Sequence, residues 1–194
     1  MVDRDVFLVE RCLEGDEEAC EALVRRYQDR VFSLIYRIIG GTDQVEDIAQ
    51  EAFLKAFRSL KSFRGGSSFY TWLYRITVNT ALNAMRSQGR RQEASIEDLG
   101  GLESLVDPDA GPAESAARRQ LASRVREAID RLDEQYRTIV YLRELEDLSY
   151  EEIAEVVELP VGTVKSRLFR ARQHLKELLE DLLPALARER GTSS

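Results

Sequence analysis

A segment near the C-terminus holds side chains whose types and spacing suit the reading of duplex DNA. Residues 159–176 contain five basic residues and no acidic residue. Apolar residues recur at helical spacing here, which predicts a helix with one buried and one polar face. Guanidinium, ammonium and hydroxyl groups pair with base edges in the major groove, and basic groups also contact phosphates. The residues that we expect to contact DNA are Thr163, Lys165, Ser166, Arg167, Phe169 and Arg170.

A second, shorter helix is predicted immediately before this one. Ser149 and Glu152 have the spacing of a capping box, in which the serine caps the helix and the glutamate reaches back to the serine amide. Two consecutive helices over residues 148–176, the second of them basic, are typical of a helix-turn-helix that reads the major groove. An ordinary amphipathic hairpin with a basic outer face is the alternative interpretation.

The predicted turn lacks the glycine that many such motifs carry. Glu158 stands at that position, so we expect the turn to depend on Pro160, which cannot continue the first helix, and on Gly162. Thr163 is expected to cap the second helix.

A second basic segment lies in the N-terminal half of the chain. Residues 52–92 contain eight basic residues, no acidic residue and several aromatic residues. Asn79 and Asn83 lie one helical turn apart, with Arg75 and Arg86 nearby. Basic groups follow phosphates, whereas aromatic rings and amides hold unstacked bases, so the segment suits single-stranded nucleic acid.

The aromatic residues of this segment have two interpretations. We expect Phe69 to contact nucleic acid together with the two asparagines. Trp72 and Tyr74 are equally well interpreted as core residues. The preceding helix differs, because Asp47, Gln50 and Glu51 lie beside two phenylalanines, Phe53 and Phe57. An acidic and polar patch next to aromatic residues suits a protein partner, although a solvated helix face has the same pattern.

The remaining sequence arranges these segments in an all-α protein of two small helical domains. Asp16 predicts the cap of a long helix that ends at Gly40. An acidic stretch rich in Gly, Pro and Ser shows no periodicity and predicts a flexible linker, whose few apolar residues suggest docking when bound. The predicted divisions are a first domain over 1–91, the acidic linker over 92–115, a second domain over 116–184 and a tail over 185–194.

The net charge of −7 is unfavourable for a DNA-binding protein taken as a whole. The acidic residues, however, are concentrated between the two basic segments, where residues 93–158 hold 18 acidic and 7 basic side chains. A local basic surface, rather than the charge of the whole chain, is typical of a nucleic-acid-binding protein.

Cys12 and Cys20 are the only cysteines and His174 is the only histidine, which is too few for a four-ligand zinc site. We therefore expect no metal and no cofactor. Both cysteines fall on apolar helical stretches, so we interpret them as small buried hydrophobic residues, with a thiol–disulfide switch as the unsupported alternative. The N-terminus has no apolar run long enough for a signal peptide or a membrane span, so we expect a cytoplasmic protein.

Three stretches resemble one protein family: EDIAQEAFLKAFRSLKSFRG, FYTWLYRITVNTA and LRELEDLSYEEIAEVVELPVGTVKSRLFRAR. They are similar to the extracytoplasmic-function sigma factors, promoter-specificity subunits of bacterial RNA polymerase, and among these to the envelope-stress sigma-E type. The resemblance implies that the first domain is a sigma region 2 helical bundle and the last a sigma region 4 helix-turn-helix. It further implies an alternative sigma factor, not an enzyme, that binds core polymerase and directs transcription from the −10 and −35 elements of stress promoters.

The resemblance also implies a role for each group of site residues. The surface that docks on the β′ coiled coil of core polymerase corresponds to Asp47, Gln50, Glu51, Phe53 and Phe57. The surface that binds the −10 element, where one base is flipped out of the stack, corresponds to Lys61, Phe63, Arg64, Ser67, Ser68, Phe69, Arg75, Asn79, Asn83 and Arg86. The surface that binds the −35 element corresponds to the helix-turn-helix residues given above. Region 4 would also contact the β flap of core polymerase.

Two further expectations follow from the resemblance. An anti-sigma factor is the expected inhibitory partner, and it would hold the protein at the inner face of the membrane without insertion. Housekeeping sigma factors have two adjacent tryptophans at the melting wedge, whereas here Trp72 is followed by Leu73. A weaker melting wedge predicts that the protein opens only a narrow set of promoters.

Three other functions explain part of the sequence. A dimeric helix-turn-helix repressor or activator needs no basic aromatic segment and binds no polymerase. An adaptor that sequesters a partner needs no recognition helix. An enzyme needs paired carboxylates in an apolar pocket or a phosphate-binding loop, and the sequence shows neither pattern.

Overall fold

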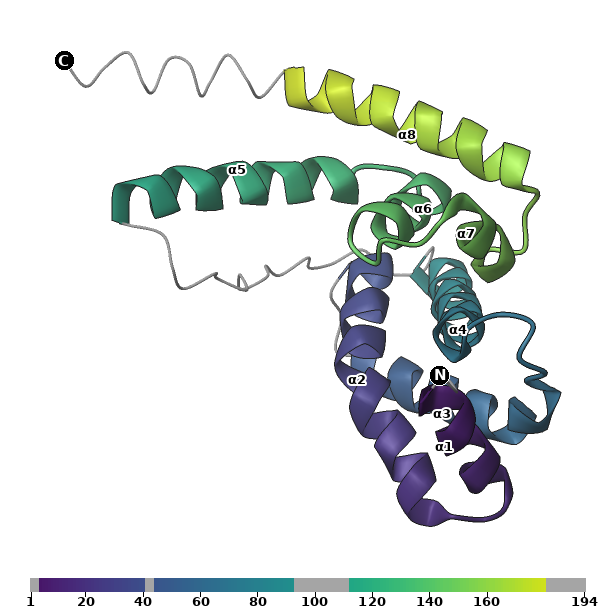
Figure 1. Cartoon of the computed structure of the whole chain (residues 1–194). Coiled ribbons are helices and arrows are strands. Elements are labelled where there is room, and N and C mark those ends of the chain that lie inside the picture. The colour runs from purple at the N-terminus through teal and green to yellow at the C-terminus, as the bar shows by residue number, and fades with distance from the viewer. Residues whose placement is uncertain (1–3, 41–43, 93–111, 181–194) are drawn as a thin grey trace.

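Every regular element in the described part of the chain is a helix, which confirms the predicted all-α class (Figure 1). The computed structural model describes residues 4–40, 44–92 and 112–180. The elements are α1 (Arg4–Leu13), α2 (Glu17–Ile39), α3 (Val45–Ser59), η1 (Leu60–Ser62, a 3₁₀ turn), α4 (Phe69–Gln92), α5 (Pro112–Asp130), α6 (Glu134–Glu144), α7 (Tyr150–Val156) and α8 (Val161–Glu180). None of these helices is both long and apolar enough to cross a membrane.

The first four helices form a bundle built around α2 (Figure 1). Asp16 caps α2 by accepting a hydrogen bond from the backbone amide of Ala19 at 3.2 Å, as the sequence predicts. Gly40 ends the helix with a φ of 80°, a left-handed conformation that glycine adopts without steric cost. The side chains that α2 buries completely are Val31, Leu34, Ile35 and Ile38.

Helices α5 to α8 form the second unit, and the linker prediction over 92–115 is only partly within the described residues. Helix α5 begins at Pro112, inside the range expected to be linker, while 93–111 and the tail over 185–194 lie outside the described residues. The predicted capping box of α7 is confirmed. Ser149 Oγ accepts from the Glu152 amide at 3.2 Å, and the Glu152 carboxylate accepts from the Ser149 amide at 2.9 Å.

The turn between α7 and α8 differs from the prediction. The turn was expected to depend on Pro160 and Gly162, but Glu158, at the position where many such motifs carry glycine, itself adopts the left-handed conformation with a φ of 54°. Helix α8 begins at Val161, which places Gly162 and Thr163 inside its first turn. Thr163 is therefore not the cap. Its amide donates to the Pro160 carbonyl oxygen at 2.8 Å.

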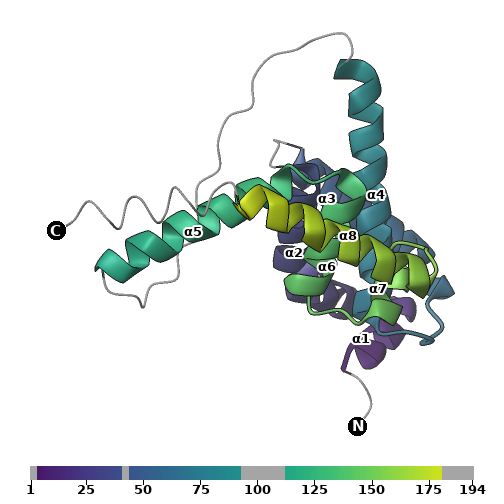
Figure 2. The same cartoon turned by 90° about the horizontal axis from the view of Figure 1, so that it is seen from above.

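The two units pack against each other through α4 with α7 and α2 with α6, and Figure 2 shows α8 crossing above α6 while α5 projects to one side. Their buried side chains form one continuous apolar cluster. Arg137 of α6 reinforces the junction by donating to the backbone carbonyl oxygen of Ile38 at 2.8 Å. That oxygen belongs to the last turn of α2, where helix carbonyls lack helical partners.

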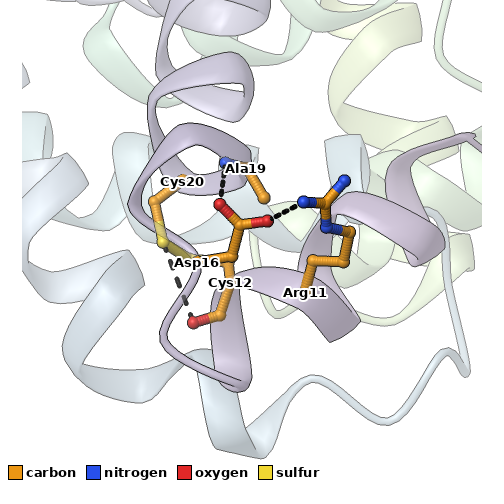
Figure 3. The surroundings of a disulfide bond; sticks show 5 residues. All are labelled: Arg11, Cys12, Asp16, Ala19 and Cys20. Carbon is orange, nitrogen blue, oxygen red and sulfur yellow. Dashed lines mark hydrogen bonds and ion pairs between the residues drawn. A yellow bond between two sulfur atoms is a disulfide. The ribbon is translucent and has the colours of Figure 1, made fainter.

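The interpretation of the cysteines as separate buried hydrophobic residues is wrong. Cys12 at the end of α1 and Cys20 in the first turns of α2 form a disulfide, with their Cα atoms 5.0 Å apart (Figure 3). Gly15, with a φ of 94°, reverses the chain between the helices and brings the two cysteines together. Arg11 forms an ion pair with the capping Asp16 beside the disulfide. Both cysteines are half-buried rather than fully enclosed.

Candidate nucleic-acid interface

Helix α8 presents to solvent the face that the sequence predicts to read DNA. Lys165, Ser166 and Arg170 are exposed, and Phe169 is 65% exposed. Thr163 and Arg167 are half-buried and lie at the edge of this face. The helix is held from its opposite face by the buried side chains of Val164, Leu168 and Ala171. A rigid helix with short polar and guanidinium groups at its N-terminal end has the form that enters a major groove.

Local contacts restrict two of these side chains. Ser166 Oγ donates to the Thr163 carbonyl oxygen at 2.9 Å, so its one donor is occupied and its lone pairs can accept from a base amino group. The Lys165 ammonium lies 5.4 Å from the centre of the Tyr150 ring. This cation–π contact holds the lysine at the start of α8, beside the turn of the motif.

Arg172 is a basic residue of α8 that contacts protein instead. Its Nη2 atom lies 2.7 Å from Oε1 of Glu144 in α6, and this hydrogen bond raises the pKa of the guanidinium. Because about half of each side chain is exposed, the pair contributes little to stability.

The basic surface of the first unit borders a groove of about 630 Å³ between α3 and α4. Its lining consists of Lys55, Arg58, Ser59, Arg75, Ile76, Asn79, Thr80, Asn83 and Glu158. The structure thus brings together three predicted −10 residues, Arg75, Asn79 and Asn83, whereas Lys61, Arg64 and Arg86 are exposed outside the lining. Two basic residues of the groove lining, Lys55 and Arg58, were not among the predicted site residues, although the acid-free composition of 52–92 was the available signal.

Phe69 is a core residue and not an exposed aromatic contact. It is 3% exposed and its ring lies 5.5 Å from that of Tyr27 and 5.7 Å from that of Trp72, measured between centroids. Trp72 and Tyr74 are buried as well, at 4% and 0% exposure. Of their two interpretations, the one as core residues is therefore correct. Phe63 is half-buried against the same cluster. The loop therefore offers its polar residues, rather than the Phe69 ring, to solvent.

Ser68 has a structural role that the sequence analysis did not assign. Its Oγ atom accepts a hydrogen bond from the Thr71 amide at 3.1 Å, as a cap does at the start of α4. The neighbouring Ser67 is half-buried, and its hydroxyl donates to Glu155 of the second unit at 2.6 Å.

The patch predicted to bind a protein partner lies on α3. Asp47, Gln50 and Glu51 are all exposed. Phe53 and Phe57 are half-buried, with ring centroids 6.5 Å apart, and both pack against the core. Leu54, which sequence reasoning missed, is 48% exposed between them and adds an apolar surface to the patch.

Comparison with known proteins identifies both units. The first matches the family description "Sigma-70 region 2" over residues 23–91, and the second matches "Sigma-70, region 4" over residues 122–175. The chain is 44% identical over 187 residues to the RNA polymerase sigma-H factor of Pseudomonas aeruginosa, covering 93% of this chain and 96% of the relative. It is 46% identical over 188 residues to the ECF RNA polymerase sigma-E factor of Escherichia coli K12, covering 92% and 96%. The chain belongs to the extracytoplasmic-function sigma factors.

A solved structure has a similar fold. The structure of CnrH in complex with the cytosolic domain of CnrY aligns with a TM-score of 0.66 at 27% identity, covering 92% of this sigma factor and 99% of CnrH. The confirmed resemblance gives the two units their names, so we call the unit of α1 to α4 region 2 and the unit of α5 to α8 region 4.

Region 2 and region 4 of this sigma factor are joined by a buried carboxylate that sequence reasoning missed. Glu146, between α6 and α7, accepts hydrogen bonds from the hydroxyls of Tyr70 at 2.6 Å and Tyr74 at 2.9 Å. It also lies 3.7 Å from Arg37, and its side chain is 9% exposed. Burial raises the pKa of both tyrosines. The hydrogen bond to Glu146 raises the pKa of Tyr70 further, and the hydrogen bond with Tyr70 and the charge of Glu146 raise the pKa of Tyr74, so both phenols remain neutral donors.

Proposed function

We propose that this sigma factor binds core RNA polymerase in the cytoplasm and acts there as a specificity subunit, without catalytic activity of its own. In this proposal it directs initiation by reading two promoter elements with two separate surfaces. The observation that supports this most strongly is the occurrence, in one chain, of an exposed recognition helix and a basic groove on a different domain. A protein that reads only duplex DNA needs the first surface alone.

The −35 surface is proposed to be the exposed face of α8. Arg170 and Lys165 supply the guanidinium and ammonium groups that bind guanine edges or phosphates. Ser166 supplies an acceptor, and the exposed Phe169 ring can contact a thymine methyl group. Thr163 and Arg167 flank this surface.

The −10 surface is proposed to be the groove between α3 and α4, with the loop before α4. Asn79 and Asn83 supply amides for the edges of unpaired bases, and Arg75 with Lys55 and Arg58 supplies charge for phosphates. Residues of the earlier set that stay in the proposal as flanking contacts are Lys61, Phe63, Arg64, Ser67, Ser68 and Arg86. Phe69 is removed from it, because its ring is enclosed in the core.

The polymerase-docking surface is proposed to be the exposed patch on α3. Asp47, Gln50 and Glu51 would bind the β′ coiled coil, and the apolar surface of Leu54 would strengthen that contact. Phe53 and Phe57 would hold the patch in shape from beneath. Contact of region 4 with the β flap is part of the same proposal.

An anti-sigma factor is the proposed inhibitory partner, and a stress regulon is the proposed target. CnrH was solved with the cytosolic domain of CnrY, and the relatives above are named sigma-E and sigma-H factors. A largely apolar groove of about 750 Å³ between α2, α5 and α6 is the proposed docking site for a helix of this partner. Its apolar lining includes Phe32, Tyr36, Leu121, Val125 and Ile129. Such a partner would hold the chain at the inner face of the membrane.

Run-off transcription from genomic fragments with core polymerase tests the proposed function. We expect discrete transcripts that require this chain and that share upstream −10 and −35 sequences. A stand-alone helix-turn-helix regulator would instead bind duplex DNA without polymerase and give no new transcript with core enzyme. A pull-down with core polymerase separates the two functions in a single step.

A further inference from the structure

We propose that Cys12 and Cys20 form a redox-sensitive site, which a peroxide oxidises to the disulfide and which thereby controls binding of the −10 element. The inference rests on the proposed function, because it assumes a cytoplasmic protein whose loop before α4 contacts promoter DNA. The oxidised chain is the form that binds the −10 element well, and the reduced chain binds it weakly.

A permanent structural role does not explain this disulfide. Glutathione and thioredoxin keep cytoplasmic thiols reduced, so a disulfide in a cytoplasmic protein is usually transient and either catalytic or redox-sensing. Permanent disulfides are typical of small secreted domains that cannot build a sufficient core. Region 2 has such a core, in which Val31, Leu34 and Ile35 of α2 are completely buried.

The two cysteines lie close enough for reversible pairing (Figure 3). Their Cα atoms are 5.0 Å apart, within the range that a disulfide spans. Gly15 reverses the chain between them, and the Asp16 amide donates to the Arg11 carbonyl oxygen at 3.0 Å, so backbone hydrogen bonds also hold this turn. The thiols therefore stay near each other after reduction. Both side chains are half-buried, so small oxidants and reductants can reach them.

The surroundings of the pair favour an uncharged oxidant. Exposed acidic side chains within a few positions of the cysteines are Glu10, Glu14, Glu17, Glu18 and Glu21. The neighbouring basic side chains are already paired, Arg11 with Asp16 and Arg25 with Glu21. An acidic surface repels glutathione disulfide, which is an anion, whereas hydrogen peroxide carries no charge.

The oxidation moves two electrons from sulfur to the peroxide. The thiolate of one cysteine attacks an oxygen atom of hydrogen peroxide and breaks the O–O bond, which gives a sulfenic acid and hydroxide. The thiolate of the other cysteine then attacks this sulfur, so that the S–S bond forms and a second hydroxide leaves. The two protons lost by the thiols convert both hydroxides to water. Exchange with a dithiol protein restores the two thiols and leaves the disulfide on that protein.

Helix α1 depends on few contacts besides the disulfide. Val9 is its buried apolar side chain, whereas Phe7 is 51% and Leu13 is 41% exposed. A helix of 10 residues is not stable by itself in water, so α1 persists only while it is docked. The disulfide joins the last turn of α1 to α2, and its reduction therefore weakens this docking.

The first turn of α1 is connected to the loop before α4 through Tyr27. Asp5 is buried and accepts a hydrogen bond from the Tyr27 hydroxyl, and Arg26 lies 3.2 Å from the same carboxylate. The Tyr27 ring lies 5.5 Å from that of Phe69, which lies 5.7 Å from that of Phe63, measured between centroids. Phe63 begins the loop that carries flanking −10 residues, and α1 also contacts η1 just before it. Firm docking of α1 thus holds the aromatic cluster on which this loop rests.

The first test measures the redox state of the full chain. The protein is equilibrated in a glutathione buffer of cytosolic ratio, freed of the buffer, and treated with hydrogen peroxide or with an equal concentration of glutathione disulfide. Alkylation and mass spectrometry count the free thiols. We expect both thiols to be free in the buffer, and to be lost faster with peroxide than with glutathione disulfide. A disulfide that persists in the buffer, or faster oxidation by glutathione disulfide, would overturn the proposal.

The second test measures binding of the −10 element. The oxidised or reduced chain is freed of reagent and assembled with core polymerase, and fluorescence anisotropy follows a labelled single strand with the −10 sequence of a promoter mapped by the run-off assay. We expect the reduced form to bind about tenfold more weakly, and its α1 amides to exchange hydrogen about tenfold faster, within the range by which a disulfide shifts an opening equilibrium. The variant Cys12→Ser/Cys20→Ser should match the reduced form with or without peroxide.

The variant Tyr27→Phe tests the connection between the two sites. It removes the hydroxyl that donates to Asp5 and keeps the ring, so the disulfide should still form while the affinities of the oxidised and reduced forms converge. Equal affinity of the two wild-type forms, a peroxide response in the serine variant, or an undiminished response in Tyr27→Phe would contradict the proposal. If neither form directs transcription from a promoter, the proposed function fails, whereas equal transcription by both forms rejects only the redox site.

Discussion

Substitution of Glu146 by alanine should weaken the junction between regions 2 and 4 more than the substitution of any other single polar residue at that junction. The carboxylate accepts two tyrosine hydroxyls, at 2.6 and 2.9 Å, with Arg37 at 3.7 Å. A hydrogen bond to a charged group contributes about 1.5–3 kcal/mol, and loss of this acceptor also leaves two phenols unsatisfied in a largely buried site. Because the Arg37 side chain is 32% exposed, its ion pair with Glu146 adds little to the free energy of unfolding.

We therefore expect Glu146→Ala to lower the free energy of unfolding by about 3 kcal/mol. Urea titration followed by circular dichroism reports both regions, while fluorescence of the single tryptophan, Trp72 of region 2, reports one. The midpoint should fall by about 1–3 M urea. In a double-mutant cycle with Tyr74→Phe, we expect a coupling free energy of about 1–2 kcal/mol. Glu151→Ala, an exposed acid of region 4, is the matched control and should change stability by less than about 0.5 kcal/mol. Zero coupling between Glu146 and Tyr74 would refute the reasoning.

Three further predictions concern the proposed −35 surface of α8, the disulfide and the effect of alkaline pH on stability. Arg170→Ala should abolish −35-dependent run-off transcription while core-polymerase binding in a pull-down is retained; joint loss of both would contradict the separation of surfaces. The Cys12–Cys20 disulfide joins two residues that are 8 positions apart in sequence. Its reduction should lower the free energy of unfolding by about 2.5 kcal/mol, because the reduced unfolded chain gains entropy. The stability of the variant Cys12→Ser/Cys20→Ser should not change with dithiothreitol. Burial, aided by Asp130, raises the pKa of Tyr141 to about 12, so the folded state holds a proton that the unfolded state loses near pH 10, and stability should decline from about pH 10 to 12. Tyr141→Phe should make that decline shallower in pH-dependent thermal melts, and an unchanged slope would count against this assignment.

Features controlled by a few neighbouring residues were predictable from the sequence. The Asp16 cap and the capping box of Ser149 with Glu152 each involve groups three residues apart, so their hydrogen bonds depend on local geometry alone. The basic face of α8 was predictable for the same reason, since helical periodicity decides which side chains share a face.

The site differed from the prediction wherever a distant part of the chain decided the outcome. The Phe69 ring is enclosed in part by Tyr27 of another helix, whose ring centroid lies 5.5 Å away, and nothing near Phe69 in sequence indicates that neighbour. The turn between α7 and α8 was expected to depend on Pro160 and Gly162, yet Glu158 itself adopts the left-handed conformation there.

The sequence by itself determined the helices, the caps made by Asp16 and Ser149, the two basic faces and the membership of the family, because each depends on residue types at short spacing. Only the tertiary structure decided which aromatic rings are buried, that Cys12 and Cys20 lie close enough to pair, and that Glu146 joins two domains. These features depend on which surfaces meet after the chain has folded back on itself. Periodicity specifies that a helix has an apolar face, but only packing specifies what covers that face.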